Sequence, residues 1–317
     1  MEIAWWMWGV FLGIVSVMLV LDLGVLHRKE RAISIKESLL LSGAYIMVSL
    51  LFGVWVWAEL GADRGREYFT GYIVEKTLAM DNLFIISLLF SHFAIPRQYQ
   101  HRVLFWGVLG VIILRGLMIG GGALLVSRFS LVLEFFAAFL VVTGVKMLYV
   151  ADKPMDISKG KLLRFLRKHL RITPELHGKA FSVMQPDAKN PARNVRYYTP
   201  LFVVLVLIEI ADIIFAVDSI PAIFAITDNP YVIYTSNIFA VLGLRALYFA
   251  LNEMLKRFHY LKPTLGLVLI FIGGKVFLED LTEKPMPASI SLSVTVLLLA
   301  GGVVYSLMKT RGDKHKE

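Results

Sequence analysis

Long apolar stretches, separated by short polar segments, run through almost the whole chain. Several are longer than the roughly 20 residues that an α-helix needs to cross the hydrocarbon core of a membrane. The pattern predicts an all-α polytopic membrane protein with about nine transmembrane helices. They are expected at residues 4–26, 38–60, 69–95, 103–126, 131–150, 200–227, 237–251, 264–278 and 288–308, with an alternative start near residue 231 for the seventh.

Positively charged residues lie mainly on one side of these helices. If the N-terminus is outside, the inner segments hold 24 of the 33 Lys and Arg residues and the outer segments hold four. Such an excess of positive charge is typical of cytoplasmic loops. We therefore expect an outside N-terminus and a cytoplasmic C-terminus. The first helix has no cleavage site after it and is expected to be retained rather than removed as a signal peptide.

Composition agrees with this class of protein. Apolar residues make up 57% of the chain and charged residues 18%, against roughly 45–50% and 25% in soluble domains. The absence of Cys excludes disulfides, thiolate zinc sites and Cys nucleophiles. The net charge of +9 follows from the membrane topology and needs no nucleic-acid partner.

A ten-residue segment occurs twice, and both copies place carboxylates inside apolar stretches. The copies are EKTLAMDNLF, residues 75–84, and DIIFAVDSIP, residues 212–221. The matched polar pairs are Glu75 with Asp212, Asp81 with Asp218, and Asn82 with Ser219. A charged side chain at mid-bilayer costs roughly 2.5–3.5 kcal/mol on insertion scales, so its presence needs a reason.

The similarity between the two halves continues downstream. Arg115 in LRGL matches Arg245 in LRAL, and Lys146 in GVK matches Lys275 in GGK. In the predicted topology the two copies enter the membrane from opposite faces. Inverted repeats of this kind are typical of transporters, with the site near the midplane where the repeats meet. The expected parts are two N-terminal helices (1–68), a first three-helix repeat (69–150), a basic cytoplasmic loop (151–199), a second three-helix repeat (200–282), and a last helix with its tail (283–317).

Oxygen-bearing side chains of the two copies form a candidate metal site. The predicted ligands are Asp81, Asn82, Asp218 and Ser219, with Glu75, Glu209 and Asp212 close by. Acids six residues apart lie about 120° apart on a straight helix. We therefore expect local unwinding, which Pro221 favours because it cannot donate a backbone hydrogen bond. Oxygen ligands without Cys or His suit hard cations such as Mg²⁺, Ca²⁺ and especially Mn²⁺.

A purely structural role for these charges is the alternative. The intramembrane bases that could neutralise the acids are Lys76, Arg115, Lys146, Arg245 and Lys275. Of these, Arg115 and Arg245 are expected to hold Glu75 or Asp212 in place. The lysines nearer helix ends, Lys146 and Lys275, can snorkel to the membrane surface. Because apolar replacements of buried ion pairs are often neutral or stabilising, the presence of these charges favours a function.

The motifs together resemble the TerC family, and most closely its Alx branch. The resemblance covers essentially the whole chain and rests on EKTLAMDN from Glu75, VLGVIILRGLMI from Val108, GVKM from Gly144, IEIADIIFAVDSIPAIFAIT from Ile208 and SNIFAVLGLRALYF from Ser236. It implies a bacterial inner-membrane protein that exports Mn²⁺, in a family labelled for tellurite resistance. It also implies that the transport pathway contains Glu75, Asp81, Glu209, Asp212 and Asp218.

We therefore expect a transporter, not an enzyme, which exports Mn²⁺ as its substrate and uses no organic cofactor. The expected direct ligands are Asp81 and Asp218, assisted by Asn82 and Ser219. Second ligands or proton carriers, with protons as counter-ion, are expected to be Glu75, Glu209 and Asp212. The charge of the empty site is expected to be balanced by Arg115 and Arg245.

Two other functions stay open at this stage. The first is a membrane module that supplies Mn²⁺ to secreted metalloenzymes at the translocation machinery, docking through the loop 151–199. Within this loop, residues 159–172 predict a basic amphipathic helix that lies on the anionic lipids of the inner leaflet. The second is an intramembrane enzyme with an Asp pair, which the matching Arg and Lys residues of both halves disfavour.

Overall fold

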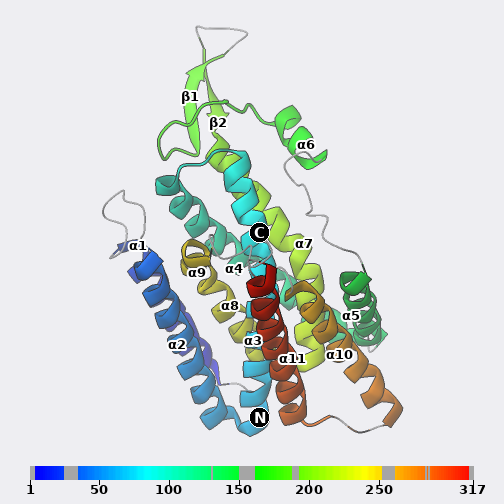
Figure 1. The fold of residues 1–317 in the computed structure, drawn as a ribbon. Helices are drawn as coiled ribbons and strands as arrows, with labels where there is room; N and C mark the ends of the chain where they lie inside the picture. The colour runs from blue at the N-terminus through cyan, green and yellow to red at the C-terminus, as the bar shows by residue number, and fades with distance from the viewer. Residues whose placement is uncertain are drawn as a thin grey trace.

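The structure is a computed structural model that describes residues 4–24, 35–129, 131–149, 161–187, 193–251, 261–282, 284 and 286–313. Its helices are α1 (Trp5–Gly24), α2 (Ile35–Leu60), α3 (Ala62–His92), α4 (Arg97–Arg128), α5 (Leu131–Tyr149), α6 (Lys161–His169), α7 (Pro200–Ile226), α8 (Pro230–Leu242), α9 (Leu244–Leu251), α10 (Leu261–Thr282) and α11 (Ala288–Asp313). Two short strands, β1 (Ser182–Pro186) and β2 (Asn194–Tyr198), complete the fold (Figure 1).

Six segments of the described helices are long and apolar enough to cross a membrane. They are Lys36–Leu60, Arg97–Val126, Leu131–Tyr149, Pro200–Val217, Pro230–Phe249 and Ala288–Ser306. An all-α membrane protein is therefore confirmed, whereas the full set of nine transmembrane helices stays a prediction. The seventh predicted helix begins at Pro230, close to the earlier of its two expected starts.

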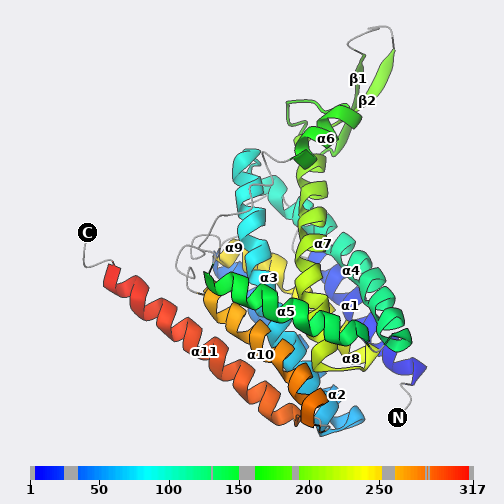
Figure 2. The ribbon, with the colours of Figure 1, turned by 90° about the vertical axis from the view of Figure 1, so that its right-hand side faces the viewer.

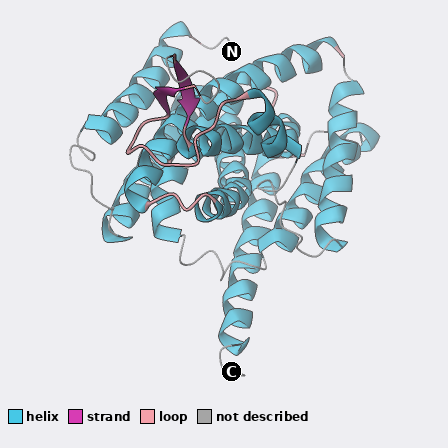
Figure 3. Ribbon diagram, turned by 90° about the horizontal axis from the view of Figure 1, so that it is seen from above, coloured by secondary structure: helices cyan, strands magenta, loops and turns pink. Residues whose placement is uncertain are grey.

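Helices α3 and α7 lie at the centre of the bundle and pack against each other (Figures 1 and 2). Helix α4 packs against α7, and α8 packs against α3. Helices α5 and α10 approach closely through Gly144, Gly266 and Gly273, where an added Cβ would meet backbone atoms of the other helix. The C-terminal half of α11 extends away from the other helices (Figures 2 and 3).

The central helices do not unwind where the sequence predicted a break. Helix α7 continues through Pro221, and α3 continues through residues 75–84. The expected unwinding at Pro221 is therefore wrong. A proline inside a membrane helix is tolerated where its surroundings satisfy the freed backbone groups. The described interruption lies instead in the seventh predicted helix, at Gly243 between α8 and α9.

The loop between the two halves is more ordered than the sequence indicated. Strands β1 and β2 form an antiparallel hairpin in which Ser182 pairs with Tyr198. This hairpin projects beyond the helix ends (Figures 1 and 2). The amphipathic helix is α6, and its Leu166 is buried against the ends of the central helices. One apolar residue of α6 therefore packs on the protein itself, while Phe165 stays exposed.

Candidate functional site

Three charged side chains from three helices meet in the interior of the bundle. The guanidinium of Arg115 on α4 donates from Nε to Asp212 Oδ2 at 3.0 Å and from Nη2 to Asp212 Oδ1 at 2.8 Å. Its Nη1 group pairs with Glu75 Oε1. The exposed fractions are 1% for Arg115, 3% for Glu75 and 5% for Asp212. The two acids that match each other in the repeat thus share one buried arginine.

Two amides complete this cluster. Asn82 of α3 donates from Nδ2 to Asp212 Oδ1 at 3.2 Å, and Arg115 Nη1 donates to Asn237 Oδ1 at 3.0 Å. Asn237 on α8 is fully buried and was not among the site residues predicted from the sequence. The available signal was a polar amide in an apolar stretch. The cluster therefore draws on α3, α4, α7 and α8.

Several buried oxygen atoms of the described residues have no hydrogen-bond partner. Among them, Asn82 Oδ1 belongs to the cluster, and Glu209 Oε2 lies one helical turn before Asp212. The Glu209 carboxylate lies against Gly110 of α4, where an added Cβ would overlap it. Because buried oxygens are normally hydrogen-bonded, these two are candidates for contact with a bound cation or water.

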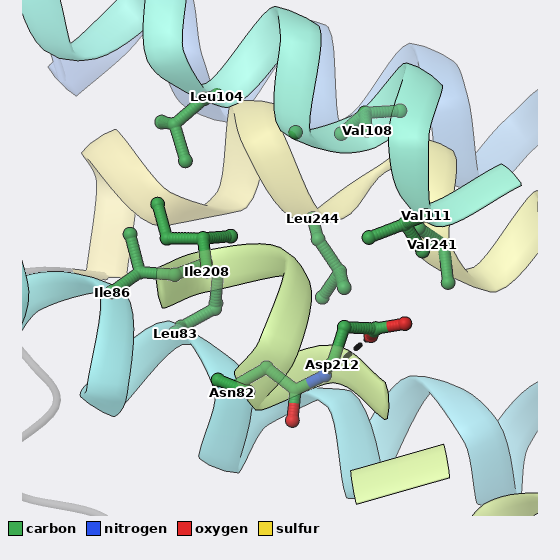
Figure 4. Close-up of a pocket in the computed structure, with 12 residues that line it drawn as sticks. Asn82, Leu83, Ile86, Leu104, Val108, Val111, Ile208, Asp212, Val241 and Leu244 are labelled. Atoms are coloured by element: carbon green, nitrogen blue, oxygen red, sulfur yellow. Dashed lines mark hydrogen bonds between the residues drawn. The ribbon is translucent and has the colours of Figure 1, made fainter. Parts of the chain in front are cut away.

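A small cavity of about 40 Å³ adjoins the cluster. Asn82 and Asp212 form its polar end, and their hydrogen bond is drawn in Figure 4. Apolar side chains of α3, α4, α7, α8 and α9 form the rest of the wall, among them Ile86, Leu104 and Ile208 (Figure 4). A cavity of this size can hold a few water molecules. It extends from the acids toward the His92 end of α3 and the Pro200 end of α7.

Several predicted site residues lie outside the cluster or outside the description. The side chains of Asp81, Asp218 and Arg245 are not among the described ones. Asp81 and Asp218 lie on α3 and α7, about 9 Å along the helix axis from the paired acids Glu75 and Asp212. Ser219, in contrast, is buried on α7 beside the Glu75 carboxylate of the cluster.

The predicted basic residues divide into different environments. Lys76 donates to the backbone carbonyl of Ala240 at 3.0 Å. Lys275 Nζ lies 3.6 Å from Glu279 Oε1 on the same helix and donates to the backbone carbonyl oxygen of Ala225 at 3.5 Å. Lys146 is exposed. Among the described bases, only Arg115 forms an ion pair with an acid of the cluster.

The described part of the cluster carries two carboxylates and one guanidinium, which gives a net charge of −1 when all are ionised. No three His, Cys, Asp or Glu residues with described side chains form a metal-binding group. Glu75 and Asp212 are instead engaged by Arg115. A metal ion at this place would therefore need further oxygen ligands or displacement of the arginine.

The chain is similar to known membrane proteins over most of its length. A family model described as "Integral membrane protein TerC family" matches residues 60–314. An "Uncharacterized membrane protein" of Rickettsia felis is 47% identical over 308 residues, which cover 97% of this chain and 99% of the relative. The "Putative membrane-bound redox modulator Alx" is 43% identical in Photorhabdus laumondii, over 92% of both chains, and 40% identical in Escherichia coli, over 98% of this chain and 97% of the relative. No solved structure matches.

Proposed function

Because the chain belongs to the TerC family of integral membrane proteins, we propose that it exports Mn²⁺ across a bacterial inner membrane through a carboxylate-lined site at the bilayer midplane. The N-terminus would lie outside and the C-terminus in the cytoplasm. The observation that carries this proposal is the meeting of Glu75 and Asp212 on one buried arginine beside a cavity. Buried acids inside membrane helices usually mark ion pathways.

The packing of the central helices supports an inverted repeat. In the repeat α3 corresponds to α7, and α4 corresponds to α8 with α9. Helix α4 packs against α7, as α8 packs against α3, and α3 packs against α7. These contacts are the ones expected of two halves related by a two-fold axis between α3 and α7. A site at that axis fits the midplane sites of inverted-repeat transporters.

In this arrangement Asp81 and Asp218 would supply carboxylate ligands at two successive points on the path of Mn²⁺, because on the antiparallel helices α3 and α7 they lie on opposite sides of the paired acids. The partnerless Oδ1 atom of Asn82 is suited to join Asp81, because its amide group is already oriented by Asp212. Ser219 would be a further oxygen ligand, and Glu75, Glu209 and Asp212 would be second ligands or proton carriers. Carboxylate and amide oxygens are the ligands that hard divalent cations prefer. Arg115 would balance the acids while the site is empty.

The two sides of the site differ in a way that fits cytoplasmic access. In the predicted topology, the cavity lies on the cytoplasmic side of Asp212. The opposite side is filled by apolar side chains of α7, including Ile220, Ile223 and Ile226. At the outer end, Arg64 Nη1 binds Asp228 Oδ1 at 2.6 Å and Glu67 Oε2 at 2.8 Å, joining α3 to the turn after α7. A cavity on this side of the acids supports loading from the cytoplasm.

The test uses purified protein in lipid vesicles and a panel of Mn²⁺, Mg²⁺ and Ca²⁺, with and without a pH gradient. Mn²⁺ should cross the membrane in a protein-dependent manner. Asp81→Ala and Asp218→Ala should remain in the membrane at normal amounts and lose Mn²⁺ transport. Unchanged transport by either variant would contradict its assignment as a ligand. Loss of transport only in the absence of a pH gradient would identify protons as counter-ion.

A second candidate function is the supply of Mn²⁺ to secreted metalloenzymes at the translocation machinery. The hairpin of β1 and β2 projects beyond the bundle and offers a surface that transport itself does not need (Figure 2). Deletion of residues 182–198 distinguishes the two functions. Intact transport together with inactive secreted metalloenzymes would favour the supply role. The names of the Alx relatives concern redox modulation, but this chain has no Cys for thiol exchange.

A further inference from the structure

Lys76 follows Glu75 directly in the chain but makes an entirely different contact. Its Nζ group donates to the backbone carbonyl of Ala240, near the end of α8, at 3.0 Å. No carboxylate with a described side chain forms an ion pair with Lys76. The ammonium group of this largely buried lysine is thus bound to a backbone carbonyl of α8. This arrangement needs an explanation.

The contact lies at the interruption between α8 and α9. Helix α8 ends at Leu242, α9 begins at Leu244, and Gly243 lies between them. In an unbroken helix the carbonyl of Ala240 would accept from the N–H group of Leu244. Insertion of a side chain into this ladder of hydrogen bonds is a known cause of a helix kink. A positive charge is also favourable at the C-terminal end of a helix.

Gly243 leaves the space that the ammonium group occupies. A Cβ added at this position would lie 2.5 Å from Lys76 Nζ, which is too close for a real contact. Any larger residue would therefore push the lysine away from Ala240. We call the interruption at Gly243, with the Lys76–Ala240 hydrogen bond beside it, the α8–α9 joint.

The joint borders the cavity of the candidate site. Val241, two residues before Gly243, and Leu244, the first residue of α9, line the cavity together with Asn82 and Asp212 (Figure 4). A change in the angle between α8 and α9 would therefore move two wall residues relative to the acids.

We infer that Lys76 is a positioning residue, which acts with Gly243 to hold the α8–α9 joint and thereby sets access from the cavity to the buried acids. This inference rests on the proposed transport function. Lys76 contacts no ion in this role. Its loss should lower the rate of transport while the apparent affinity for Mn²⁺ stays close to that of the original protein, because the ligands are unchanged.

The natural absence of Cys allows a direct test that needs no metal. A single cysteine is introduced as Leu244→Cys, and its reaction with a small water-soluble thiol reagent is measured in vesicles without Mn²⁺. The same cysteine is then measured together with Lys76→Met, Lys76→Arg or Gly243→Ala. Gly121→Ala on α4, where an added Cβ meets nothing, is the matched control. The amount of protein in the membrane is recorded for every variant.

Lys76→Met and Gly243→Ala should each change the labelling rate by at least about tenfold, because a hydrogen bond from a charged group is worth about 1.5–3 kcal/mol. The pair of substitutions should have no more effect than either alone, because both break the same contact. Lys76→Arg keeps a charged donor and should change the rate less than Lys76→Met. The control should match the protein that carries only Leu244→Cys.

Unchanged labelling in Lys76→Met, or effects of Lys76→Met and Gly243→Ala that add, would overturn the inference. Transport is then measured in the same variants without the introduced cysteine. If the original chain fails to move Mn²⁺, the proposed function fails, but the labelling result still decides whether the joint exists. If transport occurs and Lys76→Met weakens the apparent Mn²⁺ affinity without lowering the maximal rate, Lys76 acts on the ion and not on the joint.

Discussion

Removal of the positive charge of Arg115 tests whether the buried cluster is a scaffold or a working site. Arg115→Met leaves the carboxylates of Glu75 and Asp212 facing each other without a cation. The substitution removes the bidentate contact with Asp212, the pair with Glu75 and the hydrogen bond to Asn237. All four side chains are almost fully buried.

The magnitude follows from this burial. Breaking a buried ion pair by removing one partner costs about 3–5 kcal/mol, because the remaining charge is left uncompensated. Arg115→Met should therefore lower the melting temperature of the purified protein strongly. Arg115→Lys keeps the charge but cannot form the planar bidentate contact. It should cost about 1.5–3 kcal/mol, the value of hydrogen bonds that involve a charged group.

The decisive variant carries Arg115→Met, Glu75→Gln and Asp212→Asn together. Replacement of a whole buried ionic cluster by uncharged groups is often close to neutral for stability. The triple variant should regain most of the thermal stability that Arg115→Met loses, while Mn²⁺ transport in vesicles stays absent. Melting of the purified protein and transport in vesicles are measured on the same preparations.

A triple variant with normal transport would refute the reasoning, because the three charges would then serve the fold alone. If the triple variant is as unstable as Arg115→Met, uncompensated charge is not the cause of the instability. The loss of packing and hydrogen bonds would then explain it. The combination of restored stability and lost transport is expected only for a functional cluster.

Two pairs of glycines give further predictions with internal controls. Gly110→Ala places a methyl group where the Glu209 carboxylate lies, so this flexible side chain must shift; transport should fall, with a smaller loss of stability than a clash with backbone would cause. Gly120→Ala on the same helix meets nothing within 4 Å and should be neutral in melting and transport assays. Gly273→Ala brings a Cβ to 2.6 Å from the carbonyl of Ala137 and should destabilise the contact of α5 with α10, whereas its neighbour Gly274→Ala should not. Equal melting temperatures within either pair would contradict the close packing that the structure shows.

The sequence predicted the membrane class and the approximate helices, because apolar length is a strong local signal. It also identified Glu75, Asp212 and Arg115 as related charges, since ionised groups are rare in apolar helices. Their arrangement around one arginine depends on the packing of three helices that lie far apart in the chain. No local pattern contains that information.

The predictions that failed have physical reasons as well. Pro221 was expected to break α7, but packing on all sides keeps the helix continuous, and the interruption lies at Gly243 instead. Because glycine is common in the apolar stretches of membrane helices, Gly243 by itself did not predict an interruption. The hairpin of β1 and β2 was missed because five-residue strands with few apolar residues carry little periodic signal.

The unequal lengths of the helices have a consequence for the surrounding lipid. The described part of α5 covers 19 residues, about 28 Å, and so already reaches close to the roughly 30 Å of a hydrocarbon core. Helix α4 has 32 residues, about 48 Å, and must tilt or project beyond the bilayer. A thicker bilayer would strain α5 and its close partner α10, while α4 could respond by a change of tilt. Acyl-chain length is therefore expected to shift the position of the α5–α10 pair against α7, the central helix on which both pack.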